Sequence, residues 1–291
     1  MYTAPFEYHR ARSVDEAVAL LGEHGDDAKL LAGGHSLIPL LKLRFAHPKH
    51  LIDVRKIPNL SGIRDDGEVI VIGAATTHTQ IERSSLIERK LPILAEAAHV
   101  IGDPLVRNMG TVGGSLAHAD PGADFPAVML VLGAEMRAIG PRGPRTIAAD
   151  DFFFDLLTTA LAPNELLTEI RIPVPRAGTG GAYVKFRHPA SGYALIGVAA
   201  LVMRDGGGAI REARVALTGV GTRAARARAV EQALAGKNAD DATIADAAGR
   251  VAEGLEPRDD AQGSPDYKKH LAIVYARRAI SLAIERAAGT R

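Results

Sequence analysis

Two short glycine-containing segments carry the residue types from which anion-binding loops are built. Ala32-Gly33-Gly34-His35-Ser36 and Thr111-Val112-Gly113-Gly114-Ser115 each follow an apolar stretch and lead back into apolar sequence. Glycine lacks a Cβ, so its backbone can take positive φ and approach a ligand closely enough for peptide N–H groups to donate to it directly. We predict that the two segments form the two sides of one pyrophosphate site. The alternative for each segment is a tight turn with a purely structural role.

The first segment is predicted to open a short helix. Apolar residues follow at near-helical spacing, namely Leu37, Leu40, Leu41 and Leu43. Pro39 is tolerated in a first turn, where its missing N–H costs little. A helix N-terminus carries a partial positive charge, so an anion can be held there without Lys or Arg inside the loop. Ser36 is then either a ligand contact or a plain N-cap.

Neither segment matches a familiar nucleotide-binding fingerprint. Gly33-Gly34 lacks the GxGxxG spacing of dinucleotide-binding folds, and no GKS or GKT of a P-loop occurs. The pair therefore predicts an anion site of another architecture. His118, Asp120 and Asp124 superficially suggest a metal site. In a loop rich in glycine and proline such residues are more often turn residues, so no metal is expected.

The composition excludes several classes of protein. The 291 residues include 35 basic and 34 acidic side chains, a net charge of +1, which argues against a nucleic-acid partner or an electrostatic membrane-surface role. No apolar segment reaches the roughly 18 residues that a membrane span needs. The N-terminus lacks the layout of a secretion signal, so we expect a cytoplasmic protein.

Cysteine is absent from the chain. This excludes disulfides, thiol catalysis and a cysteine-ligated iron–sulfur cluster within it. A redox role would therefore need an organic cofactor, for which flavin and nicotinamide are the candidates.

Short strands and helices are predicted to hold the glycine segments in a first domain, residues 1–177. The serine-to-glutamate spacing from Ser13 to Glu16 predicts a helix that ends at Gly22. Strands at 29–32 and 51–54 flank the first glycine segment and give a β-loop-α-β unit. Further strands are expected at 69–72, 135–139 and 166–172, and further helical pieces at 86–87, 91–100 and 126–132.

A proline- and glycine-rich stretch, 173–181, has the composition of an exposed linker and places a boundary near residue 177. Strands are predicted at 182–186, 193–203 and 210–220, the last two joined as a hairpin. Helical sequence dominates from Ala224 and ends in a long helix from Tyr267. Its predicted apolar stripe is Leu271, Val274, Tyr275 and Leu282. Residues 178–291 are thus predicted as a small sheet covered by helices, and the whole chain as an α+β fold.

The chain resembles the FAD-binding medium subunits of the molybdenum hydroxylases, the xanthine oxidase family. The resemblance lies in residues 29–37 and 111–115, followed by Pro121 and Asp124. The resemblance is strongest to carbon monoxide dehydrogenases and spans almost the whole chain. It implies a FAD-binding domain of the vanillyl-alcohol-oxidase or PCMH type with two α/β subdomains. A flavoprotein C-terminal domain follows in the family, with a three-stranded antiparallel sheet packed with helices.

The resemblance also implies which residues hold FAD. Backbone amides from Ala32 to Leu37 would bind the diphosphate, with Thr111, Gly114 and Ser115 contributing from the second segment. The full implied set is Lys29, Leu30, Leu31, Ala32, Gly33, Gly34, His35, Ser36, Leu37, Ile101, Thr111, Gly114, Ser115, Asp124, Leu167, Lys185 and Tyr193.

Five of these residues would take individual roles around the flavin. Ile101 and Leu167 would cover the ring with apolar side chains, and Tyr193 would stand close to it. Asp124 would accept hydrogen bonds from ribityl or ribose hydroxyls. Lys185 would place positive charge near the pyrimidine edge, where it stabilises the anionic reduced ring. Plainer alternatives are core packing for the apolar pair, helix capping for Asp124 and a solvated charge for Lys185.

The implied function is electron relay, with no catalytic acid, base or nucleophile in this chain. In the family a large subunit holds the molybdenum cofactor and a small subunit holds two [2Fe–2S] clusters, while the FAD of the medium subunit passes electrons onward. A dimer of heterotrimers is expected. Alternatives are an aldehyde or N-heterocycle hydroxylase, a nucleotide-binding scaffold without redox chemistry, and a single-component flavin oxidase, for which no substrate base is evident.

Overall fold

A three-stranded parallel sheet carries the first glycine segment. In the computed structural model, which describes residues 2–289, its strand order is β1 (Glu7–Arg10), β3 (His50–Asp53) and β2 (Ala28–Leu31). Helix α1 (Val14–His24) and the short turn η1 (Gly25–Asp27) join β1 to β2, and α2 (Leu37–Lys42) joins β2 to β3. The predicted β-loop-α-β unit is confirmed, and β1 is an additional strand.

Helix α1 begins where the sequence predicts and ends later. The Ser13 hydroxyl accepts a hydrogen bond from the Glu16 amide, at 3.0 Å. The predicted end at Gly22 is wrong. Gly25, at φ 51°, is the residue that ends the helix, because the chain there takes a left-handed conformation that glycine adopts without strain.

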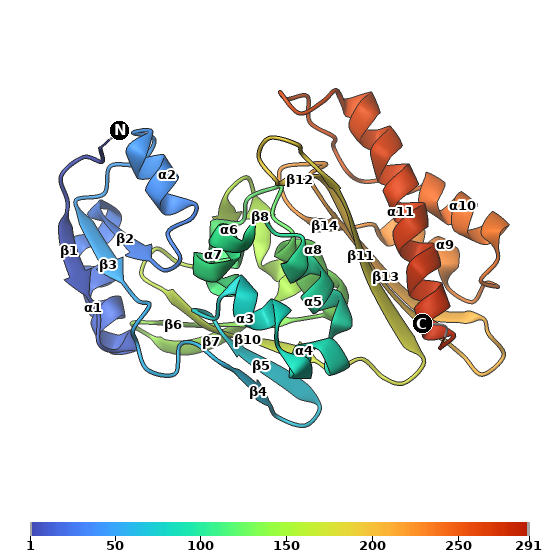
Figure 1. Ribbon diagram of the computed structural model, residues 1–291, viewed down its shortest axis with the longest axis horizontal. Helices are drawn as coiled ribbons and strands as arrows, with labels where there is room; N and C mark the ends of the chain where they lie inside the picture. Colours follow the sequence, from blue (N-terminus) through green and yellow to red (C-terminus); the bar gives the residue numbers. More distant parts are fainter. Residues whose placement is uncertain (1, 290–291) are drawn as a thin grey trace.

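A five-stranded antiparallel sheet forms the middle of the molecule (Figure 1). Its order is β4 (Ile63–Asp65), β5 (Val69–Gly73), β10 (Leu166–Pro173), β6 (Glu135–Gly140) and β7 (Gly143–Ala148). The helices between β5 and β6 are α3 (His78–Glu82), α4 (Ser85–Lys90), α5 (Pro92–His99), α6 (Pro104–Met109), α7 (Val112–His118) and α8 (Phe125–Leu132). After β7 come η2 (Ala149–Asp151), β8 (Phe153–Asp155) and β9 (Thr158–Thr159). This gives the two predicted α/β subdomains.

The second glycine segment starts helix α7, so the prediction of a glycine turn there is wrong. Thr111 is the N-cap, and its hydroxyl accepts a hydrogen bond from the Gly114 amide at 3.1 Å. A Cβ at Gly113 would lie 2.5 Å from the Cβ and 2.6 Å from the carbonyl oxygen of Ala74. Glycine is therefore needed here because the start of α7 packs directly against the chain that leaves β5.

The C-terminal part is an antiparallel sheet covered by helices. Its strands, in order, are β11 (Thr179–Arg187), β12 (Ala194–Arg204), β13 (Ile210–Thr218) and β14 (Ala225–Arg226). The helices are α9 (Arg228–Leu234), α10 (Asp241–Gly249) and α11 (Pro265–Ala287). The β12–β13 hairpin is confirmed, and β14 makes four strands where the sequence predicts three. The predicted boundary near residue 177 lies in the connection between β10 and β11.

Strand β12 is buried on both of its faces. Every residue from Ala194 to Ala200 is buried. Val198 and Ala200 belong to the core shared with α9, α10 and α11, whereas Ala199 belongs to the core of the first domain, with Tyr183 of β11. The sheet is thus packed between its own helices and the first domain (Figure 1). This explains why the sequence of β12 is continuously apolar.

Helix α11 crosses the C-terminal sheet on a face of small residues. The buried alanines are Ala272, Ala276, Ala279 and Ala283, whereas only Leu271 of the predicted apolar stripe is buried. A Cβ at Gly180 of β11 would overlap the Ala283 carbonyl oxygen. Small side chains therefore let the helix lie close to the strand. Of the predicted stripe, Tyr275 and Leu282 pack against this core from its edge and Val274 does not, so the stripe is only partly confirmed. Among residues 2–289, the structure holds no helix with the length and apolar character of a membrane span.

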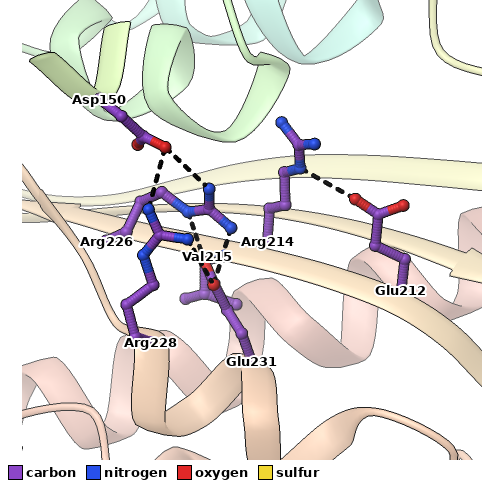
Figure 2. A network of polar contacts seen from close by, with 7 residues as sticks. All are labelled: Asp150, Glu212, Arg214, Val215, Arg226, Arg228 and Glu231. Atoms are coloured by element: carbon purple, nitrogen blue, oxygen red, sulfur yellow. Dashed lines mark hydrogen bonds and ion pairs between the residues drawn. The ribbon is translucent and has the colours of Figure 1, made fainter.

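A polar network fixes β14 at the edge of this sheet (Figure 2). Glu231 of α9 accepts hydrogen bonds from the Val215 amide at 2.9 Å and from Arg226 Nε at 2.8 Å. Arg226 and Arg228 also contact Asp150 of the first domain, at 3.2 and 2.9 Å. Ion pairs therefore join the short strand both to α9 and to Asp150 of the first domain.

Candidate functional site

A cavity of about 550 Å³ lies where the N-terminal sheet, α7 and the turn before β12 meet. Both glycine segments line it, together with the start of β10 and residues 191–193. Its volume falls in the range of about 300–1,000 Å³ that is usual for cofactor and ligand pockets. The two segments therefore share one cleft, as the sequence predicts.

Gly33 packs directly against Met109 and Gly110, the two residues before the second glycine segment. A Cβ at this position would overlap the Met109 carbonyl oxygen and lie 2.8 Å from Gly110 Cα. Gly34 has φ 75°, a backbone conformation that residues other than glycine rarely adopt. One glycine thus allows the close approach of the two segments, and the next allows the chain to turn back into α2.

The first segment offers free main-chain donors. Ile38 donates its amide to the Gly34 carbonyl at 2.9 Å, which closes the turn. Within residues 2–289, the amides of Gly33, Gly34 and His35 donate to no protein acceptor. Peptide donors that stay unpaired beside a cavity are the groups that an anion needs.

The second segment offers mainly hydroxyls, because four of its five amides are bound within the protein. Val112 donates its amide to Thr76 O at 3.0 Å, Gly113 to Ala74 O at 2.8 Å, and Ser115 to Thr111 O at 3.0 Å. The Gly114 amide is bound by the Thr111 hydroxyl. Within residues 2–289, only the Thr111 amide of this segment donates to no protein acceptor, so the prediction of free backbone amides is wrong for residues 112–115 and is retained for Thr111 alone. The other polar groups that the segment can present to a ligand are the side chains of Thr111 and Ser115, both of which line the cavity.

A buried ion pair lies behind one wall of the cavity. Asp124 is 4 % exposed and accepts hydrogen bonds from Tyr183 Oη at 2.6 Å and from Lys185 Nζ at 2.9 Å. Lys185 also donates to Val100 O at 3.1 Å. Burial raises the pKa of Asp124, and the Lys185 charge opposes that shift; burial likewise lowers the pKa of Lys185.

These contacts contradict two of the plainer alternatives and bear on a third expectation. The Asp124 side chain does not cap α8. Lys185 is not a solvated charge, since its side chain is 3 % exposed. It is also not among the residues that line the cavity, which Asp124 reaches and Lys185 does not. The role of Lys185 beside the flavin stays a prediction, and the contact that the structure shows is with Asp124, whose carboxylate Lys185 pairs with and orients.

The structure brings most of the predicted site residues to the cavity. Besides Asp124, the predicted residues that line it are Lys29, Leu30, Ala32, Gly33, Gly34, His35, Ser36, Leu37, Ile101, Thr111, Gly114, Ser115, Leu167 and Tyr193. Leu31 does not line it. The Leu31 side chain packs beneath the turn, where its Cδ1 would lie 3.3 Å from a Cβ at Gly34.

Tyr193 stands at the mouth of the cavity, with 38 % of its surface exposed. Its burial and the nearby charge of Asp120 raise the pKa of the phenol, so the hydroxyl stays protonated and available as a donor at neutral pH.

His78 is a cavity residue that the sequence does not reveal. It is 5 % exposed, and its ring meets Phe125 edge-on at 5.2 Å. Within residues 2–289 its Nδ1 has no hydrogen-bond partner, although it is buried. Burial is the main cause that lowers the pKa of His78 to about 4. The capping box of Thr77 and Gln80 predicts a helix start but gives no sign that the next residue points inward.

We expect His78 to make the protein sensitive to acid. Its folded-state pKa of about 4 lies below the ordinary 6.5. As the pH falls below 6.5, His78 takes up a proton in the unfolded chain but stays neutral in the folded one. The free energy of unfolding is therefore lower at pH 5 than at neutral pH, by about 2 kcal/mol. The variant His78→Leu should lose this part of the pH dependence. Urea titrations of the wild type and of His78→Leu at pH 7.5 and 5 measure this difference. An equal loss of unfolding free energy in both proteins would contradict the prediction.

Comparison with known proteins gives two family matches that together cover most of the chain. Residues 4–175 match the FAD binding domain in molybdopterin dehydrogenase. Residues 181–283 match the CO dehydrogenase flavoprotein C-terminal domain. The first match contains both glycine segments.

Individual relatives are similar over the full length. The carbon monoxide dehydrogenase medium chain of Hydrogenophaga pseudoflava is 46 % identical over 283 residues, covering 97 % of this chain and 98 % of that one. A solved carbon monoxide dehydrogenase from the same organism superposes with a TM-score of 0.95 at 47 % identity, over 98 % of this chain and 99 % of its own. Quinoline 2-oxidoreductase from Pseudomonas putida 86 gives a TM-score of 0.93 at 36 % identity, with 99 % of both chains covered.

Proposed function

This chain belongs to the family of FAD-binding medium subunits of the molybdenum hydroxylases, and from that premise we propose that it binds one FAD in the cavity and serves as the electron-transfer subunit of a carbon monoxide dehydrogenase. The observation that carries the proposal is the cleft itself. Free amides of residues 33–35 and the hydroxyls of Thr111 and Ser115 face one space of suitable volume.

The cavity residues fit the parts of FAD by their chemistry. The turn from Ala32 to Leu37 would hold the diphosphate through its amides, with the Thr111 and Ser115 hydroxyls as further donors. Gly114 leaves room for the Thr111 hydroxyl, since a Cβ there would lie 2.8 Å from Thr111 Oγ1. Lys29 is exposed at the rim and would lie at the adenine end.

The opposite end of the cavity suits a flavin ring. Ile101 and Leu167 offer apolar contacts, and Tyr193 also lines the cavity. Asp124 would accept hydrogen bonds from hydroxyls of the ribityl chain, because its carboxylate is held charged by Lys185. When bound, FAD supplies the redox centre that takes electrons from one partner and passes them to another. We assign no catalytic acid, base or nucleophile to this chain.

Partner chains would supply the remaining redox centres. The chain has no cysteine, so [2Fe–2S] clusters would lie in a small subunit and the molybdenum cofactor in a large one. We propose a dimer of such heterotrimers, located in the cytoplasm, with residues 1–177 and 178–291 as the two domains of this subunit.

A medium subunit for another substrate is the second candidate. The observation in its favour is the close fit of the quinoline 2-oxidoreductase chain, so the fold of this subunit serves N-heterocycle chemistry as well. The same reasoning applies to an aldehyde substrate, since the substrate is selected outside this chain. A colourless nucleotide-binding scaffold is the alternative without redox chemistry.

Two measurements test the proposal. The purified chain, supplied with FAD and desalted, should show an oxidised-flavin absorbance that dithionite bleaches and air restores, whereas riboflavin, which lacks the diphosphate, should be removed by desalting. A protein that stays colourless would reject the flavoprotein function. Purification of the native complex with metal analysis, followed by assay with carbon monoxide, aldehydes and N-heterocycles, decides the substrate class.

A further inference from the structure

Three histidines from three different elements meet in the N-terminal subdomain. His9 lies in β1, His50 begins β3 and His24 is the last residue of α1, three elements that lie side by side in Figure 1. His9 Nε2 is 3.0 Å from His50 Nδ1, and the rings of His24 and His50 stack with centroids 3.7 Å apart. One nitrogen from each ring lies within 4.8 Å of the others.

A carboxylate completes the cluster. The parallel register of β1 and β3 places Glu7 opposite His50, and alternation along β1 puts Glu7 and His9 on one face. Glu7 Oε2 lies 3.5 Å from His50 Nδ1 and 3.9 Å from His9 Nε2. The three histidines are half-buried, and the cluster lies apart from the cavity, whose lining includes none of these four residues.

This set of donors has the chemistry of a transition-metal site. Imidazole nitrogen and carboxylate oxygen are the ligands that Zn²⁺ takes besides thiolate, with Zn–N distances of about 2.0–2.1 Å. Two nitrogens on a tetrahedral ion then lie roughly 3.3 Å apart, close to the 3.0 Å between His9 and His50. His24 stands at the C-terminal end of α1, where the helix dipole favours a cation.

We propose that His9, His24 and His50, with Glu7 as fourth ligand, bind a divalent transition cation of the Zn²⁺ type. Sequence spacing suggests only His118, Asp120 and Asp124 as metal candidates, because His9, His24 and His50 lie far apart along the chain. The ion would join β1, β3 and α1, and β3 pairs with β2, from which the Ala32–Leu37 turn leaves. It would therefore brace the subdomain that carries this turn.

Zinc binding to the untagged full-length chain tests the proposal. After chelator treatment and exchange into chelator-free buffer, calorimetric titration with ZnCl₂ should give one tight site per chain. His24→Gln should weaken that site by about 100-fold, because one of three imidazole ligands is lost. His47→Gln is the matched control: His47 is exposed, lies outside the cluster and should leave the affinity unchanged.

Two further readouts keep the test independent of folding defects. Excess ZnCl₂ should raise the melting temperature of the wild type and of His47→Gln, but not of His24→Gln, because only a ligand that binds the folded state stabilises it. Glu7→Gln changes a side chain that is 74 % exposed, so the fold should persist while zinc affinity falls about tenfold. Equal zinc affinity in the wild type and the His24→Gln variant, or no tight site in the wild type, would overturn the proposal.

Discussion

Gly33→Ala is expected to reduce bound FAD from one per chain to almost none. The added Cβ would overlap the Met109 carbonyl oxygen and lie 2.8 Å from Gly110 Cα, and both are backbone atoms that cannot rotate away. The two segments must then separate, and the amides of residues 33–35 lose their place beside Thr111 and Ser115. Overpacking of this kind also costs about 1–3 kcal/mol of folding free energy. The ratio of flavin absorbance to protein after desalting measures the loss.

Gly22→Ala is the control for this experiment. Gly22 lies in α1 with no atom within 4 Å of its added Cβ, so alanine fits and favours the helix by about 0.5–1 kcal/mol. Its FAD content should equal that of the wild type. If Gly33→Ala retains as much FAD as Gly22→Ala, the two segments do not form one diphosphate site, and the assignment of the cavity fails.

Lys185→Met is expected to destabilise the protein by about 3–5 kcal/mol at pH 7.5. The variant leaves the Asp124 carboxylate buried with only the Tyr183 hydroxyl as side-chain partner, and an uncompensated buried charge is the costly result of breaking such a pair. Chemical denaturation measures the change. FAD affinity should fall with it, since Asp124 loses the group that orients it.

The pH dependence identifies the cause. Without Lys185, burial raises the pKa of Asp124 further above its unfolded value. A group whose folded pKa is raised adds stability at low pH and loses that stability as the pH rises, so the defect should be smaller at pH 5.5 than at pH 8. Lys90→Met, which breaks an exposed ion pair with Asp65, should change stability little at either pH. A Lys185→Met defect that is the same at both pH values would contradict a buried unpaired carboxylate.

The first glycine turn could be predicted from sequence because its signal is local. Gly33-Gly34 followed by a helical leucine pattern specifies a turn and the start of α2 within ten residues. Strand β5 is recognisable for the same reason, since it is a short run of valine and isoleucine, and β6 and β10 are recognisable because charged residues alternate with apolar ones along them. The second segment was harder: the same glycines serve helix packing against Ala74, which lies far away in sequence.

The features that sequence could not reveal depend on distant partners. Lys185 looks like a solvated charge until the fold places it on Asp124 and Val100. His78 looks like an ordinary helix-start residue until Phe125 and Gly110 enclose it. Strand β14 has only two residues and depends on Glu231 and Asp150 for its position. No periodicity within the chain encodes such contacts.

The sheet that lies between α11 and the first domain also bears on how the protein unfolds. Tyr183, Ala199 and Ala216 belong to the core of the first domain although they lie in the second. If the chain were divided near residue 177 and the two pieces separated, both would expose apolar surface. Asp124 would also lose both of its side-chain donors, Tyr183 and Lys185. We therefore expect the two family-matched regions to unfold together as a single cooperative unit.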